Sequence, residues 1–427
     1  MKLYKYHINN LDIHHVYTKK FKSIISGIIF RFNLTKKHHV EFLLLSNLLS
    51  KTTSRFPKEE DFTEYLKDNY NTNVAGSFYK RGKVAEMIFY AATVNPIYIK
   101  EQNDLYNEKI RILKDMVLSP NLIDNKFSLE SVEKEKRLLK ERIKSNQNNT
   151  RSKAYKILLS EMFADEFYEI YKGITEEDVE KVTVDSLMEA YTSLLKESAY
   201  LFTAGDILEE NVIKAFSIWD NVSTYNRDYQ YLDYETKQIE KVNEKIVENK
   251  SNQSILMIGY RTDIRLFERL YPATYIFNSM FGGDFHSSLV KEVREKRSLA
   301  YSINSDCNYA KGFLTISAGI NHQNYEEVVS VIDEVINDYV NGNISLEIFN
   351  MSKEIIINSL YLSEDSLMGM LELLHLTIRH PKRTIDFEKR IQEIASVTLE
   401  DIQEVARCLK KDTIVLLKGV QNNEEEE

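Results

Sequence analysis

Residues 282–320 have the sequence GGDFHSSLVKEVREKRSLAYSINSDCNYAKGFLTISAGI, in which a charged helical segment passes directly into a strand. Arg294 and Tyr301 stand seven residues apart where the helical pattern ends. Seven residues are close to two helical turns, so this spacing can direct two hydrogen-bond donors into one cleft. The opposite interpretation is that Arg294 is one of several surface charges and that Tyr301 packs in the core beside Leu299.

Two stretches of the chain repeat one pattern, which consists of a threonine cap, an amphipathic helix and a short buried strand near a glycine. They are Lys181–Asp206 and Ser396–Gly419. The predicted helix N-caps are Thr183 and Thr398, and the predicted strands are Tyr200–Ala204 and Thr413–Leu417.

Each half of the chain also opens with a buried strand and continues with a long helix. The predicted strands are Ile24–Phe32 and Ser254–Tyr260, and the predicted helices are Ser131–Asn146 and Tyr325–Asn341. Strands mixed with long helices in two copies predict a duplicated α+β fold. The sequence predicts an N-terminal half at 1–217, a polar, tyrosine-rich join at 218–253 and a C-terminal half at 254–427.

The composition is that of a globular protein with large cores. With 427 residues, of which 43% are hydrophobic, the chain is long enough for more than one domain. The formal net charge of −9 argues against a nucleic-acid partner, because neutralising phosphates requires a basic face. Cys307 and Cys408 have no CxxC partner and are expected to be buried, reduced thiols.

The chain carries no recognisable targeting or membrane signal. The N-terminal MKLYKYHINN lacks the apolar core of a signal peptide, and no apolar run of about 18 residues occurs. We therefore expect a cytoplasmic protein without a membrane partner.

The segment around Arg294 and Tyr301 resembles the second-half signature of the pitrilysin/insulinase-type metallopeptidases, and the resemblance covers nearly the whole chain. It implies a duplicated pitrilysin/LuxS-like metalloenzyme fold, with two homologous α+β halves arranged as a clamshell. It also implies that Arg294 and Tyr301 bind the substrate backbone near the scissile bond. Gly282 and Gly283 belong to the same implied substrate-binding segment.

The zinc half of the family's site is degenerate in this chain. In the family, an inverted zinc motif, HxxEH on an N-terminal helix, supplies two zinc ligands and the general base. Alignment on the following turn, SKTTSRFPKEEDF, places Leu43, Ser46 and Asn47 at those positions. Leucine has no donor atom, and serine and asparagine are weak neutral ligands for zinc. Glu135 corresponds to the third ligand, although it fits equally well as a surface charge of an amphipathic helix.

Two histidine pairs offer alternative metal sites. The sequence HHVEF at 38–42 matches HxxE but has phenylalanine in place of the second histidine, and it otherwise fits a polar helix start. His14 and His15 lie in a predicted edge region and are expected to be exposed to solvent. Neither pair supplies a complete zinc site.

The resemblance implies that this chain binds no zinc and that an HxxEH-containing homologue supplies both zinc and the general base. The chain would then be inactive alone and would form a heterodimeric zinc peptidase that hydrolyses peptides. Two alternatives stay open: a non-catalytic scaffold or peptide-binding homologue, and a maturation pathway linked to modification of elongation factor P. In the absence of the partner, a homodimer needs only one self-complementary patch.

Overall fold

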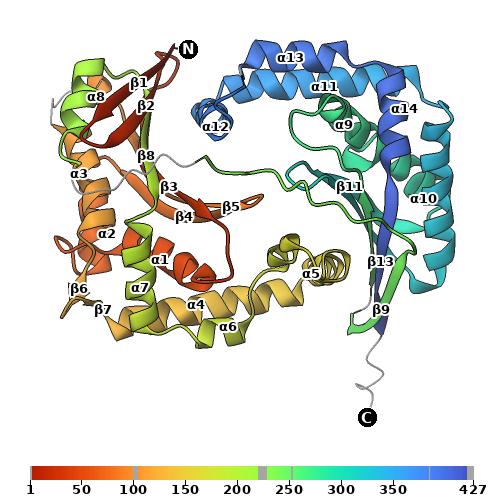
Figure 1. The fold of residues 1–427 in the computed structure, drawn as a ribbon, viewed down its shortest axis with the longest axis horizontal. Helices are drawn as coiled ribbons and strands as arrows, with labels where there is room; N and C mark the ends of the chain where they lie inside the picture. The colour runs from red at the N-terminus through yellow and green to blue at the C-terminus, as the bar shows by residue number, and fades with distance from the viewer. Residues whose placement is uncertain (1, 100–103, 220–227, 252, 384, 421–427) are drawn as a thin grey trace. The chain divides into compact units, whose positions relative to one another are not determined.

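A computed structural model of the chain describes residues 2–99, 104–219, 228–251, 253–383 and 385–420. These residues form two compact units, each built on one β-sheet with helices packed against it (Figure 1). The α+β class predicted from the sequence is confirmed. The first unit consists of Met1–Ile143, Ile174–Tyr231 and Ser363–Thr384, and the second of Lys144–Gly173, Leu232–Leu362 and Ile385–Glu427.

The first unit holds a six-stranded sheet. Its strands are β1 (Lys2–Ile8), β2 (Leu11–Tyr17), β3 (Ser23–Asn33), β4 (Asn73–Arg81), β5 (Val84–Val94) and β8 (Ser198–Gly205). Their order is β1-β2-β8-β3-β5-β4, and neighbours are antiparallel except β2 and β8, which are parallel. Two further short strands, β6 (Leu122–Ile123) and β7 (Lys126–Phe127), pair with each other.

The first unit also contains helices. They are α1 (His39–Lys51), α2 (Glu59–Asp68), α3 (Leu105–Leu118), most of α4 (Leu129–Asn148), α6 (Glu176–Glu180), α7 (Val184–Leu194), α8 (Glu209–Phe216) and α12 (Leu367–Arg379). Ile25 and Ile29 of β3 pack with Leu371 of α12. The alternate residues Ile24 and Ile28 are also fully buried, which explains the almost continuous apolar run of this strand.

The second unit holds a five-stranded sheet. Its strands are β9 (Asn243–Lys250), β10 (Ser254–Arg261), β11 (Ala300–Asn308), β12 (Phe313–Ile320) and β13 (Lys410–Val420). Their order is β11-β12-β10-β13-β9, and only β13 and β9 are parallel. The helices are α5 (Thr150–Met162), α9 (Tyr271–Asn278), α10 (Tyr325–Val340), α11 (Leu346–Glu364), α13 (Phe387–Ser396) and α14 (Leu399–Cys408).

The core of the second unit has two layers, one on each face of β10. Leu256 and Ile258 lie in a large cluster with apolar residues of α9, α10 and α14. The alternate residues Ile255 and Met257 pack with Leu158 of α5. Central strand β10 is therefore buried on both faces, as β3 is in the first unit.

The two sheets share one connectivity, which supports the internal repeat. The order β2-β8-β3-β5-β4 corresponds to β9-β13-β10-β12-β11, and both orders place their single parallel pair at the same end. The predicted caps are also confirmed. Thr183 forms a capping box with Ser186 at the start of α7, and Thr398 forms one with Asp401 at the start of α14.

Each unit contains a helix from the other half of the sequence. Helix α5 packs on β10 and β13 of the second unit, and α12 packs on the sheet of the first. The two helices hold corresponding places in the repeat, because α5 follows long helix α4 and α12 follows long helix α11. The two compact units therefore do not coincide with the two halves of the sequence. The predicted boundaries at 217 and 254 concern the sequence repeat, and they remain a prediction.

The structure bears on the predicted join and on the predicted exposure of the histidine pair at 14 and 15. The predicted join, 218–253, contains β9, a full strand of the second sheet, while 220–227 and 252 lie outside the described residues. The expectation that His14 and His15 lie exposed at a sheet edge is wrong. Strand β2 pairs with a neighbour on each side, and His15 is only 1% exposed, because an added strand, β1, forms the edge.

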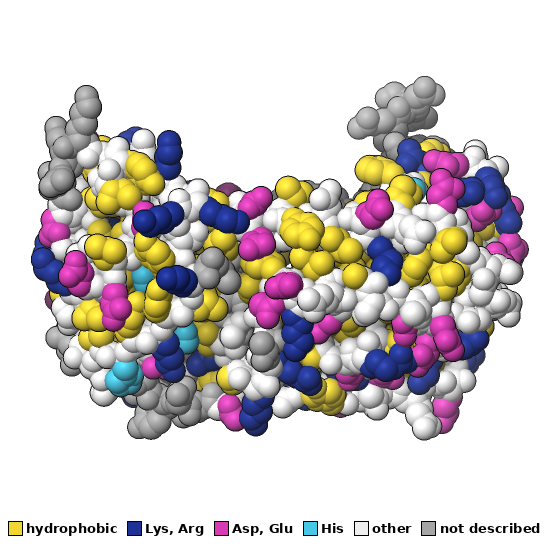
Figure 2. All heavy atoms as spheres, turned by 90° about the horizontal axis from the view of Figure 1, so that it is seen from above, with side chains coloured by type: hydrophobic (Ala, Val, Ile, Leu, Met, Phe, Trp, Pro, Cys, Tyr) yellow, Lys and Arg dark blue, Asp and Glu magenta, His cyan; other side chains and the backbone are white. Residues whose placement is uncertain are grey.

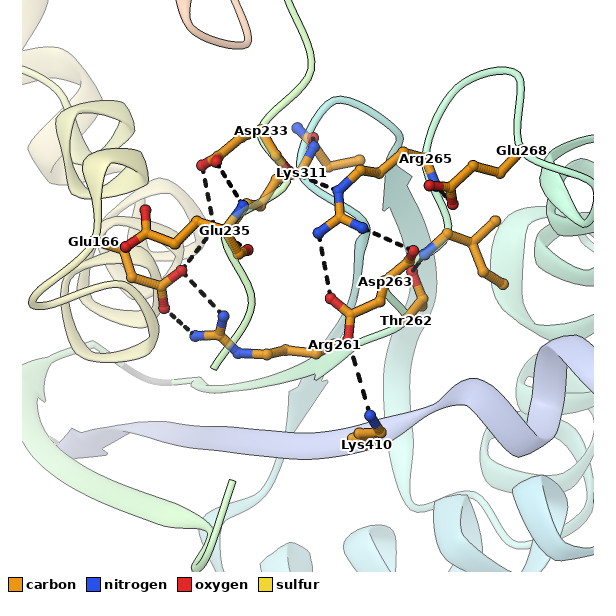
Figure 3. Close-up of polar contacts among 12 residues, drawn as sticks. Glu166, Asp233, Glu235, Arg261, Thr262, Asp263, Arg265, Glu268, Lys311 and Lys410 are labelled. Carbon is orange, nitrogen blue, oxygen red and sulfur yellow. Dashed lines mark hydrogen bonds and ion pairs between the residues drawn. The ribbon is translucent and has the colours of Figure 1, made fainter. Parts of the chain in front are cut away.

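A buried network of charges connects Lys144–Gly173, the part of the first half that belongs to the second unit, to the second sheet (Figure 3). Arg261 of β10 donates from Nη2 to Glu166 Oε1 at 2.5 Å and from Nε to Asp412 Oδ2 at 2.5 Å. Lys311 Nζ lies 2.6 Å from Glu166 Oε2 and 3.1 Å from Asp233 Oδ2. Because each charge has an opposite partner, the network can remain buried.

On the face drawn in Figure 2, acidic and basic side chains are interspersed. Within the described ranges, no helix is both long enough and apolar enough to pass through a bilayer.

Cys307 and Cys408 form no disulfide, and burial, with a contribution from Asp306, raises the pKa of Cys307 to about 12. The Cys307 thiol is therefore protonated at neutral pH.

Candidate functional site

The segment predicted to bind substrate lies in the second unit, between α9 and β12. Two short π-helical turns, η3 (Ser279–Gly283) and η4 (Val290–Lys296), lead into β11. The helix predicted over this segment is therefore divided into two pieces. Single π-helical turns occur frequently at functional sites.

The glycine pair lets η3 lie directly against β11. A Cβ on Gly282 would come within 2.6 Å of Ser305 Oγ and 2.9 Å of Leu289 Cδ1. A Cβ on Gly283 would come within 2.8 Å of Asn278 Nδ2. Ser305 Oγ donates to Asn278 Oδ1 at 2.7 Å and fixes the same contact. Both glycines thus position the segment, and direct contact with substrate stays a prediction for them.

A β-bulge turns the Tyr301 side chain out of the core. Ala300 and Ser302 pair with consecutive residues of β12, so Tyr301 is the extra residue of β11. Ala300 and Ile303 are three residues apart and still lie in the same apolar cluster, which regular two-residue alternation does not allow. Tyr301 is 71% exposed, so the interpretation that it packs in the core beside Leu299 is wrong.

Arg294 differs from the other basic residues of its segment. Lys296 donates to Glu292 at 2.7 Å, and Arg297 donates to Glu334 at 2.8 Å. Arg294 is exposed and forms no ion pair with any described residue. Its guanidinium N–H donors are therefore not engaged by a carboxylate of the described residues.

A tight turn links Arg294 to Tyr301. Ser298 has a φ of 52°, and the N–H of Leu299 donates to the carbonyl oxygen of Val293 at 2.9 Å. The hydrogen bond closes the end of η4 as a helix C-cap does. It holds the start of β11 to the turn that carries Arg294.

Strand β11 lies at the edge of its sheet. Its only partner among the described strands is β12, so its outer backbone groups can pair with another extended chain. Arg151 of α5 donates to Asn304 Oδ1 at 2.8 Å and to Ser302 Oγ at 2.8 Å. Sequence analysis missed Arg151, because no local pattern connects it to a strand that follows 150 residues later.

The degenerate motif positions all lie on α1 in the first unit. Ser46 is 5% exposed, and its Oγ donates to the carbonyl oxygen of Leu43 at 2.8 Å, so its hydroxyl satisfies the helix backbone. Asn47 is half-buried on the same helix. A leucine, an engaged serine and a neutral asparagine do not fit a zinc ion.

Glu135 is buried, at 2% exposed, so the alternative that it is a surface charge is wrong. Lys51, in the last turn of α1, donates to Glu135 Oε1 at 2.6 Å. An ammonium group thus neutralises the carboxylate that corresponds to the third ligand. The sequence analysis overlooked Lys51, although it is the basic residue that closes the motif helix.

The near match at 38–42 does not form a metal site either. The histidine of this HxxE is His38, whose Nδ1 lies 3.9 Å from Glu41 Oε1, and Phe42 stands in place of the second histidine. The neighbouring His39 is 7% exposed, and burial lowers its pKa to about 4, so it stays neutral in the interior. Across the described part of the chain, no three His, Cys, Asp or Glu side chains gather as a metal-binding group.

Comparison with known proteins finds one matching family and several similar sequences. The family described as "Peptidase M16 inactive domain" matches residues 181–356. The chain is 32% identical over 416 residues to "Probable inactive metalloprotease YmfF" of Bacillus subtilis (strain 168), with 96% of each chain covered. It is 25% identical over 320 residues to "Uncharacterized zinc protease YmxG" of the same strain, with 73% of this chain and 75% of that protein covered.

A solved structure is similar over the whole length. The crystal structure of a conserved protein from Enterococcus faecalis V583 has a TM-score of 0.94 and 25% sequence identity. The likeness covers 99% of this chain and 100% of that one.

Proposed function

Because this chain belongs to the peptidase M16 family, we propose that it is the peptide-holding, non-zinc-binding subunit of a heterodimeric zinc peptidase. The partner is a family member that carries HxxEH. The observation that carries the proposal is that one short segment holds an exposed, bulged Tyr301 and an exposed Arg294 that forms no ion pair with the residues described.

The condition of α1 supports an inactive role for the chain alone. Leu43, Ser46 and Asn47 offer no ligand set, and Lys51 neutralises Glu135. The relative YmfF is itself named an inactive metalloprotease. YmxG, named a zinc protease, comes from the same strain, so one genome can contain both kinds of relative.

The two chains would divide the chemistry between them. The HxxEH motif of the partner would hold the zinc, which would supply an acidified water, and the glutamate of that motif would accept its proton. This chain adds the outer edge of β11, which pairs with the main chain of an extended peptide. Arg294 and Tyr301 donate hydrogen bonds to carbonyl oxygens of that peptide and to the developing oxyanion.

The experiment is to co-express the chain with an HxxEH-containing relative from its own genome and to assay cleavage of fluorogenic peptides. We expect an equimolar complex with one zinc per pair, and no stoichiometric zinc in the chain alone. Arg294→Ala and Tyr301→Phe should each lower kcat/KM by about 10²–10³, because a donor aimed at the oxyanion typically contributes that factor. Size-exclusion chromatography should show both variants assembled.

Arg297→Ala is the matched control, because Arg297 lies on the same segment and is engaged by Glu334. It should keep activity within a factor of two or three of the wild type, which is roughly what an exposed pair contributes. Full activity of Arg294→Ala and Tyr301→Phe would contradict the proposal. That result would favour a scaffold that needs neither donor.

A further inference from the structure

A large pocket lies entirely within the first unit, which carries neither Arg294 nor Tyr301. Its volume is about 850 Å³, and it is lined by β1, β2, β3, β8, residues 228–231 and α12 with the turn that follows it. A volume of this order accommodates a small organic molecule or the end of a peptide.

Arg31 of β3 is an unusual residue of the pocket lining. It is 8% exposed, and its guanidinium carbon lies 5.0 Å from the ring centroid of Tyr200 and 5.6 Å from that of Tyr229. Its Nε is buried without a hydrogen-bond partner, and the group forms no ion pair with any residue that the structure describes. Burying a cation without an anion costs free energy, so an anionic ligand would stabilise the Arg31 guanidinium group.

The buried carboxylate across the strand pair from Arg31 already has other partners. Glu86 stands opposite Arg31 on the neighbouring strand β5. It accepts from Arg379 Nε at 2.9 Å and Nη2 at 2.8 Å, and from the Tyr231 hydroxyl at 3.1 Å. Arg81 Nε also lies 3.8 Å from Glu86 Oε2. The oxygens of Glu86 therefore contact Arg379, Tyr231 and Arg81, and Glu86 forms no ion pair with Arg31.

The remaining ionisable groups of the pocket do not cancel this charge. Asp12 lies 2.9 Å from Lys5 Nζ and so has its own cation. Asp228 is exposed and forms no ion pair with Arg31 in the described structure. Burial and the nearby Lys5 lower the pKa of His14 to about 4, so His14 is neutral at pH 7.

We infer that this pocket binds a carboxylate, held by the guanidinium of Arg31 and carrying an apolar or aromatic group. The inference does not depend on the proposed peptidase role, because every residue in it belongs to the first unit.

The form of the site favours a carboxylate over other ligands. A planar guanidinium with tyrosine rings beside it presents its N–H groups in its own plane, and two parallel hydrogen bonds to a carboxylate match that arrangement. Leu374, Ile378 and Pro381 line the same pocket and can pack against the apolar part of the ligand. The source can be a free carboxylic acid or the C-terminus of a peptide, since both present the same group.

The test is isothermal titration of the full chain with four probes. Benzoate and the free acid of N-acetyl-Ala-Ala-Phe present a carboxylate, while benzamide and the C-terminal amide of the same peptide do not. We expect at least one acid to bind about tenfold or more tightly than its amide, because a charge-assisted pair contributes at least that factor. Binding of both acids would point to small carboxylates, and binding of the peptide acid alone would point to peptide C-termini.

Variants of Arg31 test whether this residue binds the carboxylate. Arg31→Met should weaken acid binding about tenfold or more and should not lower the melting temperature, because it removes a buried charge without a partner. Arg31→Lys keeps the charge but loses the two parallel N–H donors of the guanidinium group, so this variant should also bind the acid more weakly. Arg137→Met, at an exposed arginine of α4, should bind like the wild type. Equal binding of acid and amide, or acid binding that Arg31→Met leaves unchanged, would overturn the inference.

Discussion

Arg261 shows how a single buried side chain stabilises one unit. It is 2% exposed and bonds both Glu166 and Asp412. Arg261→Met should therefore lower the free energy of unfolding by about 3–5 kcal/mol, because it leaves buried carboxylates without their main cation. Urea unfolding at pH 7 measures the change. Arg269→Met, at an exposed arginine with surface ion pairs, should cost less than about 1 kcal/mol.

The same variant has a predicted pH dependence. Burial alone would raise the pKa of Glu166, but hydrogen bonds from Arg261 and Lys311 outweigh burial and hold the pKa below its usual value. A carboxyl group with a lowered folded-state pKa stabilises the fold above its unfolded pKa of about 4.3, and the contribution is lost as the pH falls through the folded pKa. The difference between wild type and Arg261→Met should shrink below about pH 4. A difference that stays constant down to pH 2 would rule out this account.

At the scale of single elements, the two capping boxes allow one prediction in both units. Thr398 Oγ1 accepts from the N–H of Asp401 at 3.2 Å, and Thr183 Oγ1 accepts from the N–H of Ser186 at 3.0 Å. Thr398→Ala and Thr183→Ala should each cost about 0.5–2 kcal/mol, because a helix N-terminus loses its acceptor. Thermal unfolding measures both. Thr63→Ala, within exposed helix α2, is the control and should change stability by less than about 0.5 kcal/mol.

At the scale of the whole molecule, the exchange of α5 and α12 makes the two halves of the sequence dependent on each other. Fragment 232–427 lacks α5, so Ile255 and Met257 lose their cover, and fragment 1–231 lacks α12. We expect neither fragment to unfold cooperatively on its own, because each leaves an apolar sheet face in water. Binding of a hydrophobic dye and calorimetry test this. Co-expression of both fragments should restore a cooperative transition, and independent folding of each fragment would contradict the prediction.

The sequence by itself determined those features that depend on neighbours along the chain. Alternating or continuous apolar runs located β3, β8, β10 and β13, and threonines before amphipathic helices located the caps of α7 and α14. These signals act over a few residues, so they are independent of distant packing. The α+β class and the repeat follow from them. The degenerate positions Leu43, Ser46 and Asn47 are instead what the family resemblance implies, since they depend on aligning the chain with the HxxEH motif.

Only the tertiary structure decided the features that depend on distant partners. The apolar stripe of α5 or α12 predicts that the helix is covered, but does not specify which sheet covers it. Pairing register produces the bulge that exposes Tyr301, and no property of residue 301 alone shows it. Lys51 contacts Glu135, whereas no carboxylate of the described ranges pairs with Arg31. Which side chains far apart in the sequence come into contact is decided only when the strands and helices pack.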